Sequence, residues 1–265
     1  MARVQIPARA CVFDRNVVLI TSLGTGIQVF PRNHPDMPDT SLEELLERNE
    51  RHVAGLPANH FVDVETAQHP AAVSICCSDS RIPQSGMWDV EEPGWLFTPS
   101  TIGNQVWDVY EGEHVVDGSV LYPIHATDTN VIIVVGHTGC GAVTSTLEHL
   151  QEDTEPLPPG IQKWIDSLLP VIADGLDDER IDATADVSLV DQLVEYNVDR
   201  QVEFLLEREE IPPDEEIYGF VYDFQGVYGT DRGRAYLVNA NGKTRLDRLR
   251  DAIPARFEYQ ARRLC

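Results

Sequence analysis

The sequence of 265 residues is poor in lysine and lacks any long apolar run. Only two lysines, Lys163 and Lys243, accompany 44 acidic residues, and the formal net charge is −24. A surface of this charge repels nucleic acid and anionic membranes. No run approaches the roughly 18 apolar residues of a membrane span, and the first residues lack the apolar core of a signal peptide. We therefore expect a soluble, cytoplasmic protein that binds neither nucleic acid nor membranes.

The shortage of basic residues also bears on the solution in which the protein works. The acidic residues are spread along the chain rather than gathered in a tail. At about 1 M salt the Debye length is roughly 3 Å, so the repulsion among such charges is largely screened. The composition therefore predicts a halophilic protein with an acidic surface. The alternative is a mesophilic acidic protein whose charge lies mainly in a tail.

Cysteine is also scarce. The chain has five cysteines, which are Cys11, Cys76, Cys77, Cys140 and Cys265. An odd number in a cytosolic-looking chain is poor evidence for disulfides and better evidence for metal or thiol chemistry.

Short β-branched runs alternate with segments of helical periodicity. This alternation predicts an α/β fold with a mostly parallel central sheet of about four to five strands, flanked by helices. We expect the main strands over 71–75, 130–135, 217–222 and 234–238, and helices over 41–53, 115–124, 138–150, 187–208 and 245–264.

The predicted domain organisation is simple. Residues 1–40 carry several prolines and are expected to form an N-terminal arm. Residues 41–265 are expected to form a single α/β domain. Within it, about 151–185 is predicted to be an acidic surface insertion with an amphipathic piece around 161–172.

Two polar segments follow the two strands of most apolar sequence. Cys76-Cys77-Ser78-Asp79-Ser80-Arg81 follows the strand 71–75, and Gly136-His137-Thr138-Gly139-Cys140-Gly141 follows the strand 130–135. Open α/β sheets bind ligands where their strands end. Cysteine sulfur and histidine nitrogen are the usual ligands of tetrahedral zinc. The two segments therefore predict a Zn²⁺ site at the edge of the sheet.

The expected ligands are Cys77, His137 and Cys140. His137 and Cys140 are three residues apart, and one short turn can direct both to one point if a helix begins at Thr138. Cys76 competes with Cys77, but adjacent side chains of a strand face opposite sides. Cys77 has the same parity as Asp79 and Arg81, which favours Cys77. Three protein ligands leave a fourth position for water, as in catalytic sites.

Asp79 and Arg81 are the predicted catalytic residues. They can form a bidentate ion pair beside the metal. In that state Asp79 can accept a hydrogen bond from zinc-bound hydroxide and orient it. Released from Arg81, Asp79 could take the fourth zinc position and close the site. The alternative is that the pair only ties a loop together.

The motifs C-S-D-S-R and G-H-T-G-C-G-A-V resemble those of the β-class carbonic anhydrases. Weaker likenesses lie in 45–53, 197–202 and 218–223. The resemblance implies zinc bound by Cys77, His137 and Cys140, and reversible hydration of carbon dioxide to bicarbonate and a proton by zinc-bound hydroxide. It also implies a four-stranded parallel core and a homodimer or higher homo-oligomer, in which an N-terminal helix reaches onto the partner.

Two stretches depart from the family pattern. Residues 100–104 retain the glycine of the usual R-N-A-G but lack its arginine and asparagine, and Leu121 stands where S-x-E-Y has an acid. These changes leave two other functions open. One is hydrolysis of carbonyl sulfide or carbon disulfide at the same site, and the other is a non-catalytic zinc-binding homologue.

Overall fold

The computed structural model describes residues 41–151 and 155–265, so the predicted N-terminal arm lies outside the described residues. A central sheet has the strand order β2-β1-β6-β7-β8, and the short β3 also pairs with β1. All neighbours are parallel except β7 and β8. The predicted α/β class with a mostly parallel sheet is confirmed. The strands are β1 (Ala72–Cys77), β2 (Leu96–Phe97), β3 (Ser100–Thr101), β6 (Val131–His137), β7 (Glu216–Asp223) and β8 (Arg234–Ala240).

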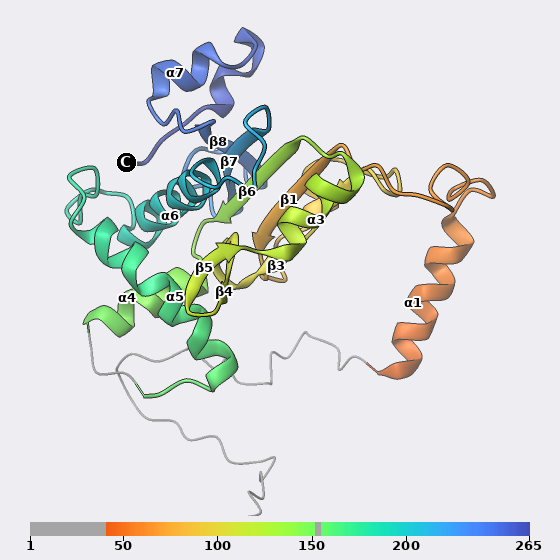
Figure 1. The fold of residues 1–265 in the computed structure, drawn as a ribbon, viewed down its shortest axis with the longest axis horizontal. Helices are drawn as coiled ribbons and strands as arrows, with labels where there is room; N and C mark the ends of the chain where they lie inside the picture. The colour runs from red at the N-terminus through yellow and green to blue at the C-terminus, as the bar shows by residue number, and fades with distance from the viewer. Residues whose placement is uncertain (1–40, 152–154) are drawn as a thin grey trace, which may run out of the picture.

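Helices lie against this sheet (Figure 1). The long predicted helix 187–208 is observed as α6, and the helix predicted from residue 41 is observed as α1, where Ser41 accepts the Glu44 N–H as N-cap. The helices are α1 (Leu42–Gly55), α2 (Gln84–Met87), α3 (Gly118–Thr127), α4 (Gly141–Gln151), α5 (Pro159–Leu176), α6 (Leu189–Leu206) and α7 (Leu246–Asp251).

Two predicted helices differ in extent. The helix expected over 115–124 begins only at Gly118, because Val115 and Val116 belong to a hairpin of β4 (Trp107–Tyr110) and β5 (Glu113–Val116). The helix expected over 245–264 is broken into α7 and a 3₁₀ helix over Ala255–Gln260. Pro254 stands between them, and proline disfavours helical geometry in the residue before it.

Helix α6 packs closely on the strand that carries His137. A Cβ on Gly136 of β6 would lie 2.7 Å from Val198 Cγ2, so only glycine allows this approach. The same helix buries amides: Asn197 Nδ2 donates to the Gly103 carbonyl at 3.1 Å, and Gln201 Oε1 accepts the Val106 N–H at 2.9 Å. These bonds fix the loop that follows β3.

The acidic segment 151–185 contains part of the core. Its amphipathic piece is α5, which contacts α4 and α6. Leu168, Val171 and Ile172 of α5 are buried in the main cluster of apolar side chains. The charge of the segment predicted a surface insertion, but α5 is partly buried. Its apolar residues recur on one side of the helix and face the core.

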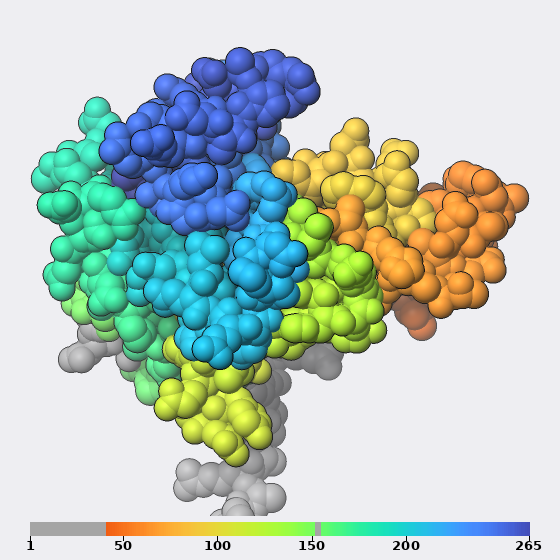
Figure 2. All heavy atoms as spheres, turned by 45° about the horizontal axis from the view of Figure 1, so that its top comes forward, coloured from red at the N-terminus to blue at the C-terminus, as the bar shows by residue number. Residues whose placement is uncertain are grey.

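Helix α1 is the exception to this packing. None of its residues is buried, and it projects from the body at one end of the molecule (Figures 1 and 2). Four of its apolar side chains are more than half exposed: Leu42, Leu45, Leu46 and Val53. Among the described residues, no helix has both the length and the apolar character needed to cross a membrane.

Candidate metal centre

The three predicted ligands come together at one edge of the sheet. Cys77 is the last residue of β1 and His137 is the last residue of β6, which is its parallel neighbour. Cys140 comes just before α4. One ligand atom from each residue lies within 4.8 Å of the others. The two Sγ atoms are 3.8 Å apart, close to the roughly 3.8 Å expected for two sulfurs bound about 2.3 Å from one tetrahedral zinc ion.

His137 is oriented as a metal ligand would be. Its Nδ1 donates to the Thr138 carbonyl at 3.0 Å, and its side chain is fully buried. Its Nε2 is buried and has no hydrogen-bond partner. A buried polar atom without a partner is rare in proteins. A zinc ion bound by Nε2, with Nδ1–H donating to a backbone carbonyl, accounts for both nitrogens.

The turn between the two ligands differs from the expected helix. Helix α4 begins at Gly141 rather than at Thr138, because Gly139 has a positive φ of 62°. That left-handed conformation suits glycine and cannot continue a right-handed helix. The turn is fixed from two sides, since the Thr138 N–H donates to the Tyr222 carbonyl at 3.2 Å and the Gly139 N–H donates to Asp191 Oδ1 at 2.8 Å.

The thiols of Cys77 and Cys140 influence each other's pKa. The hydrogen bond from Cys77 lowers the pKa of the Cys140 thiol, helped by the backbone N–H groups of Val143 and Ala142 in the first turn of α4. The same contact between the sulfurs, together with burial, raises the pKa of Cys77. A cation between the two sulfurs would favour the thiolate form of both residues.

Cys76 lies on the other face of the sheet. It is fully buried and packs with Ala72, Ile133 and Val135, in a cluster that does not include Cys77. Burial raises the pKa of its thiol to about 12. Cys76 is therefore a neutral packing residue of the core.

Asp79 and Arg81 form a bidentate ion pair next to the ligands. Arg81 Nε and Nη2 donate to Asp79 Oδ1 at 2.8 Å and Oδ2 at 2.6 Å. These hydrogen bonds lower the pKa of Asp79 to about 2. Asp79 Oδ2 also lies 3.6 Å from His137 Nε2. Strand β1 ends at Cys77, so Asp79 does not lie on the strand. A turn, in which the Asp79 N–H donates to the Cys77 carbonyl, positions its carboxylate.

Three residues at the site were not singled out from the sequence. The Phe224 ring stacks on His137 with centroids 5.9 Å apart, and Arg81 Cζ lies 4.5 Å from its centre. Asp223 is fully buried and accepts the Thr138 hydroxyl at 3.4 Å, besides four backbone N–H groups of residues 225–228. Asp191 bonds to the turn. In the sequence, Asp223 could have been noticed as an acid at the end of a predicted strand, and Asp191 as an acid near the start of a predicted helix.

The stretch that departs from the family pattern borders the site. Ser100 and Thr101 of β3 pair with Cys76 and Cys77 of β1. Gln84 Nε2 donates to Ser100 Oγ at 2.8 Å. Leu121 is partly buried against the main core cluster and does not belong to the metal group. The altered residues therefore affect the wall beside Cys77 and leave the three ligand atoms in place.

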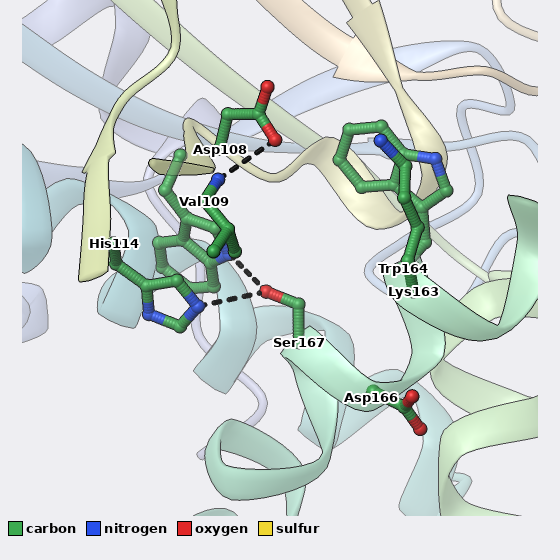
Figure 3. A pocket seen from close by; sticks show the side chains of 8 residues that line it. Asp108, Val109, His114, Lys163, Trp164, Asp166 and Ser167 are labelled. Carbon is green, nitrogen blue, oxygen red and sulfur yellow. Dashed lines mark hydrogen bonds between the residues drawn. The ribbon is translucent and has the colours of Figure 1, made fainter. Parts of the chain in front are cut away.

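A separate pocket of about 510 Å³ lies between the β4–β5 hairpin and α5 (Figure 3). In it, Trp107 Nε1 donates to Ser167 Oγ at 2.7 Å, and His114 Nε2 lies 3.2 Å from the same hydroxyl. Lys163 lies over the ring of Trp164. The lining residues include one histidine and no cysteine, so this pocket lacks the ligands of the zinc group.

Adjacent cysteines give a sharp test of the ligand assignment. Cys77→Ala should reduce bound zinc from about one ion per chain to near none after dialysis against a weak chelator. Cys76→Ala removes the same group one residue away, on the other face, and should retain the metal. Elemental analysis of both proteins measures this. Equal zinc contents in the two variants would contradict the assignment.

Comparisons with known proteins agree with this geometry. Residues 72–227 match the family model described as carbonic anhydrase. "Carbonic anhydrase 2" of Mycobacterium tuberculosis is 30% identical over 208 residues, covering 76% of this chain and 92% of the relative. The solved β-carbonic anhydrase CcaA is 26% identical, with a TM-score of 0.57 over 68% of this chain and 82% of that one. A tetrameric β-carbonic anhydrase of Sordaria macrospora, 20% identical, shares the fold, with a TM-score of 0.60 over 74% of this chain and 96% of that one. The chain belongs to the β-class carbonic anhydrase family.

Proposed function

We propose that this protein catalyses the zinc-dependent, reversible hydration of carbon dioxide to bicarbonate and a proton. The observation that carries the proposal is the meeting of three donor atoms, from Cys77, His137 and Cys140, within 4.8 Å. The Asp79 carboxylate next to them distinguishes the site from a purely structural one. Membership of the carbonic anhydrase family indicates that the reaction is carbon dioxide hydration.

Zinc at this site would act as a Lewis acid with one position open to water. In a carbonic anhydrase with three histidine ligands, zinc lowers the pKa of its bound water to about 7. The protein contributes the anionic acceptor beside that position. With its pKa near 2, Asp79 is a carboxylate throughout the neutral range, and its Oδ2 lies 3.6 Å from the ligand atom of His137. It can therefore accept a hydrogen bond from the attacking water and orient it.

Arg81 determines which way the carboxylate faces. Both oxygens of Asp79 accept from the Arg81 guanidinium, and the Arg81 backbone N–H donates to Oδ1 at 2.9 Å. The Phe224 ring lies under the guanidinium and limits its movement. We propose that this pairing keeps Asp79 off the metal in the resting protein, so that the fourth position stays open to water.

Asp79→Asn tests this role. The variant should retain zinc and lose carbon dioxide hydration by about 100-fold or more, because a neutral amide is a weaker acceptor than a carboxylate and its NH2 group can donate toward the water instead. Stopped-flow hydration at pH 7 to 9 in high salt, on protein of measured zinc content, gives the result. Loss of zinc would mean instead that Asp79 is a permanent ligand.

Asp178→Asn is a matched control for that experiment. Asp178 and Arg180 form the same bidentate pair two residues apart, with the Arg180 backbone N–H donating to Asp178 Oδ1, but they are not in the metal group. This variant should hydrate carbon dioxide at the unaltered rate. Unaltered protein that binds zinc yet shows no hydration would overturn the proposed function and favour a non-catalytic homologue.

We propose further that the protein is a homodimer or higher homo-oligomer. The exposed apolar side of the projecting α1 supports this, since residues 41–151 and 155–265 bury none of its side chains. The tetrameric relative of Sordaria macrospora also supports assembly.

A charge on the apolar side of α1 should weaken the assembly. Leu45 is 54% exposed in the single chain, so Leu45→Asp should leave the body folded while reducing the mass seen by size-exclusion chromatography with light scattering. Arg51→Gln changes the charge equally on the opposite side of α1 and should keep the mass. An unchanged mass for Leu45→Asp would argue against this interface.

We also propose that the protein is halophilic and works in the cytoplasm. Its net charge of −24 with two lysines supports the first statement. Its free cysteines support the second, because the described thiols of the zinc group must stay reduced to bind metal. Cell fractionation would check the location.

The halophilic proposal predicts a strong salt dependence of stability. The thermal unfolding midpoint should rise by more than about 5 °C between 0.1 and 2 M KCl, or about 2 kcal/mol for a domain of this size. The reason is that salt screens repulsion among the acidic residues. Circular dichroism follows the transition, and a midpoint that is constant or falls with salt would count against the proposal.

A further inference from the structure

One peptide group beside the metal centre is hydrogen-bonded at both ends. Its carbonyl, from Thr138, accepts the Nδ1–H of His137 at 3.0 Å. Its N–H, from Gly139, donates to Asp191 Oδ1 at 2.8 Å. The two bonds share a single delocalised amide, and hydrogen bonds in such a series polarise and strengthen one another. A carboxylate is thus connected to the predicted zinc ligand through one peptide.

Asp191 is placed as an anion despite its burial. It is 5% exposed and is the third residue of α6, so it lies in the first turn, where the helix dipole favours negative charge. Burial raises the pKa of Asp191 above its ordinary value, and the hydrogen bond from Gly139 offsets part of that rise. That N–H is the one hydrogen-bond donor to its side chain found within the described residues.

We propose that Asp191 is a positioning residue for His137 and acts through the peptide between residues 138 and 139. Its charge draws the N–H toward it and makes the Thr138 carbonyl a stronger acceptor. The stronger acceptor fixes the proton on Nδ1 and the plane of the ring, and it makes Nε2 a better donor to a metal. Histidine ligands often bond directly to a carboxylate for this purpose; here a peptide lies between them. The inference rests on the proposed zinc site.

A substitution that removes charge but keeps shape tests this. The amide oxygen of Asp191→Asn can still accept the Gly139 N–H, so the turn is retained and the charge is lost. We expect zinc affinity, measured by chelator competition, to fall about 10- to 100-fold. The Nδ1–H proton resonance of His137 in the zinc-loaded protein should also move upfield, because its hydrogen bond weakens.

Asp199→Asn is the control, since it alters a second buried acid of the same helix. Asp199 is 6% exposed and bonds to Arg263 and Asn239, away from the turn. It should lower the stability of the fold and leave both readouts unchanged. If Asp199→Asn changes affinity and resonance as Asp191→Asn does, the effect is one of general stability and the proposal is overturned.

Two further results would overturn the proposal. One is an Asp191→Asn protein with unchanged affinity. The other is weaker binding with an unshifted Nδ1–H resonance, which would indicate attraction through space. If Asp191→Asn does not fold, Asp191→Ser is measured by the same criteria. Neither readout uses carbon dioxide, so a protein that binds zinc and does not hydrate carbon dioxide would refute the proposed function and leave this inference standing.

Discussion

The metal centre depends first on the parallel register of β1 and β6. The pairing runs from Val73 opposite Ile132 to Cys76 opposite Val135, so the strands end side by side. Because side chains alternate along a strand, a slip of one residue would turn Cys77 to the opposite face and bring Cys76 to the site. All six residues of β1 are buried, and alternate ones pack into two separate clusters, so a slip would have to repack both close-packed faces of the strand. The core therefore determines which of two adjacent thiols can meet the metal.

The second constraint is the turn after β6. His137 is the last residue of β6, and the chain must reverse direction so that Cys140 lies near it before α4 begins. The left-handed Gly139 makes the reversal in three residues, and a Cβ there would lie 2.8 Å from the side chain of Gln225. Beginning α4 directly after Cys140 also aims N–H groups of its first turn at the sulfur, which favours the thiolate. One local geometry thus places a ligand and prepares it for a cation.

The sequence predicted the strands, and the grouping of Cys77, His137 and Cys140, because their signals are local. Both β1 and β6 are short β-branched runs followed directly by metal-binding residue types. The predicted start of α3 was wrong because apolar residues such as Val115 and Val116 suit a helix and a strand equally. They belong to the β4–β5 hairpin, whose other strand is residues 107–110. Asp191 was missed for a different reason. Its bond to Gly139 joins residues 52 apart, and no spacing rule connects the first turn of a helix to a distant turn.

The pair Asp79–Arg81 shows why a motif alone does not define a catalytic residue. Asp178 and Arg180 reproduce it, with the same backbone bond and the same fork of side-chain bonds. Arg180 also bonds to Asp199 of α6, so that pair ties the chain to the core. Asp79 instead lies 3.6 Å from an unpartnered imidazole nitrogen, with an aromatic ring against both His137 and Arg81. Local sequence builds the same ion pair twice, and of the two pairs only Asp79–Arg81 lies at the strand ends, beside the group of Cys77, His137 and Cys140.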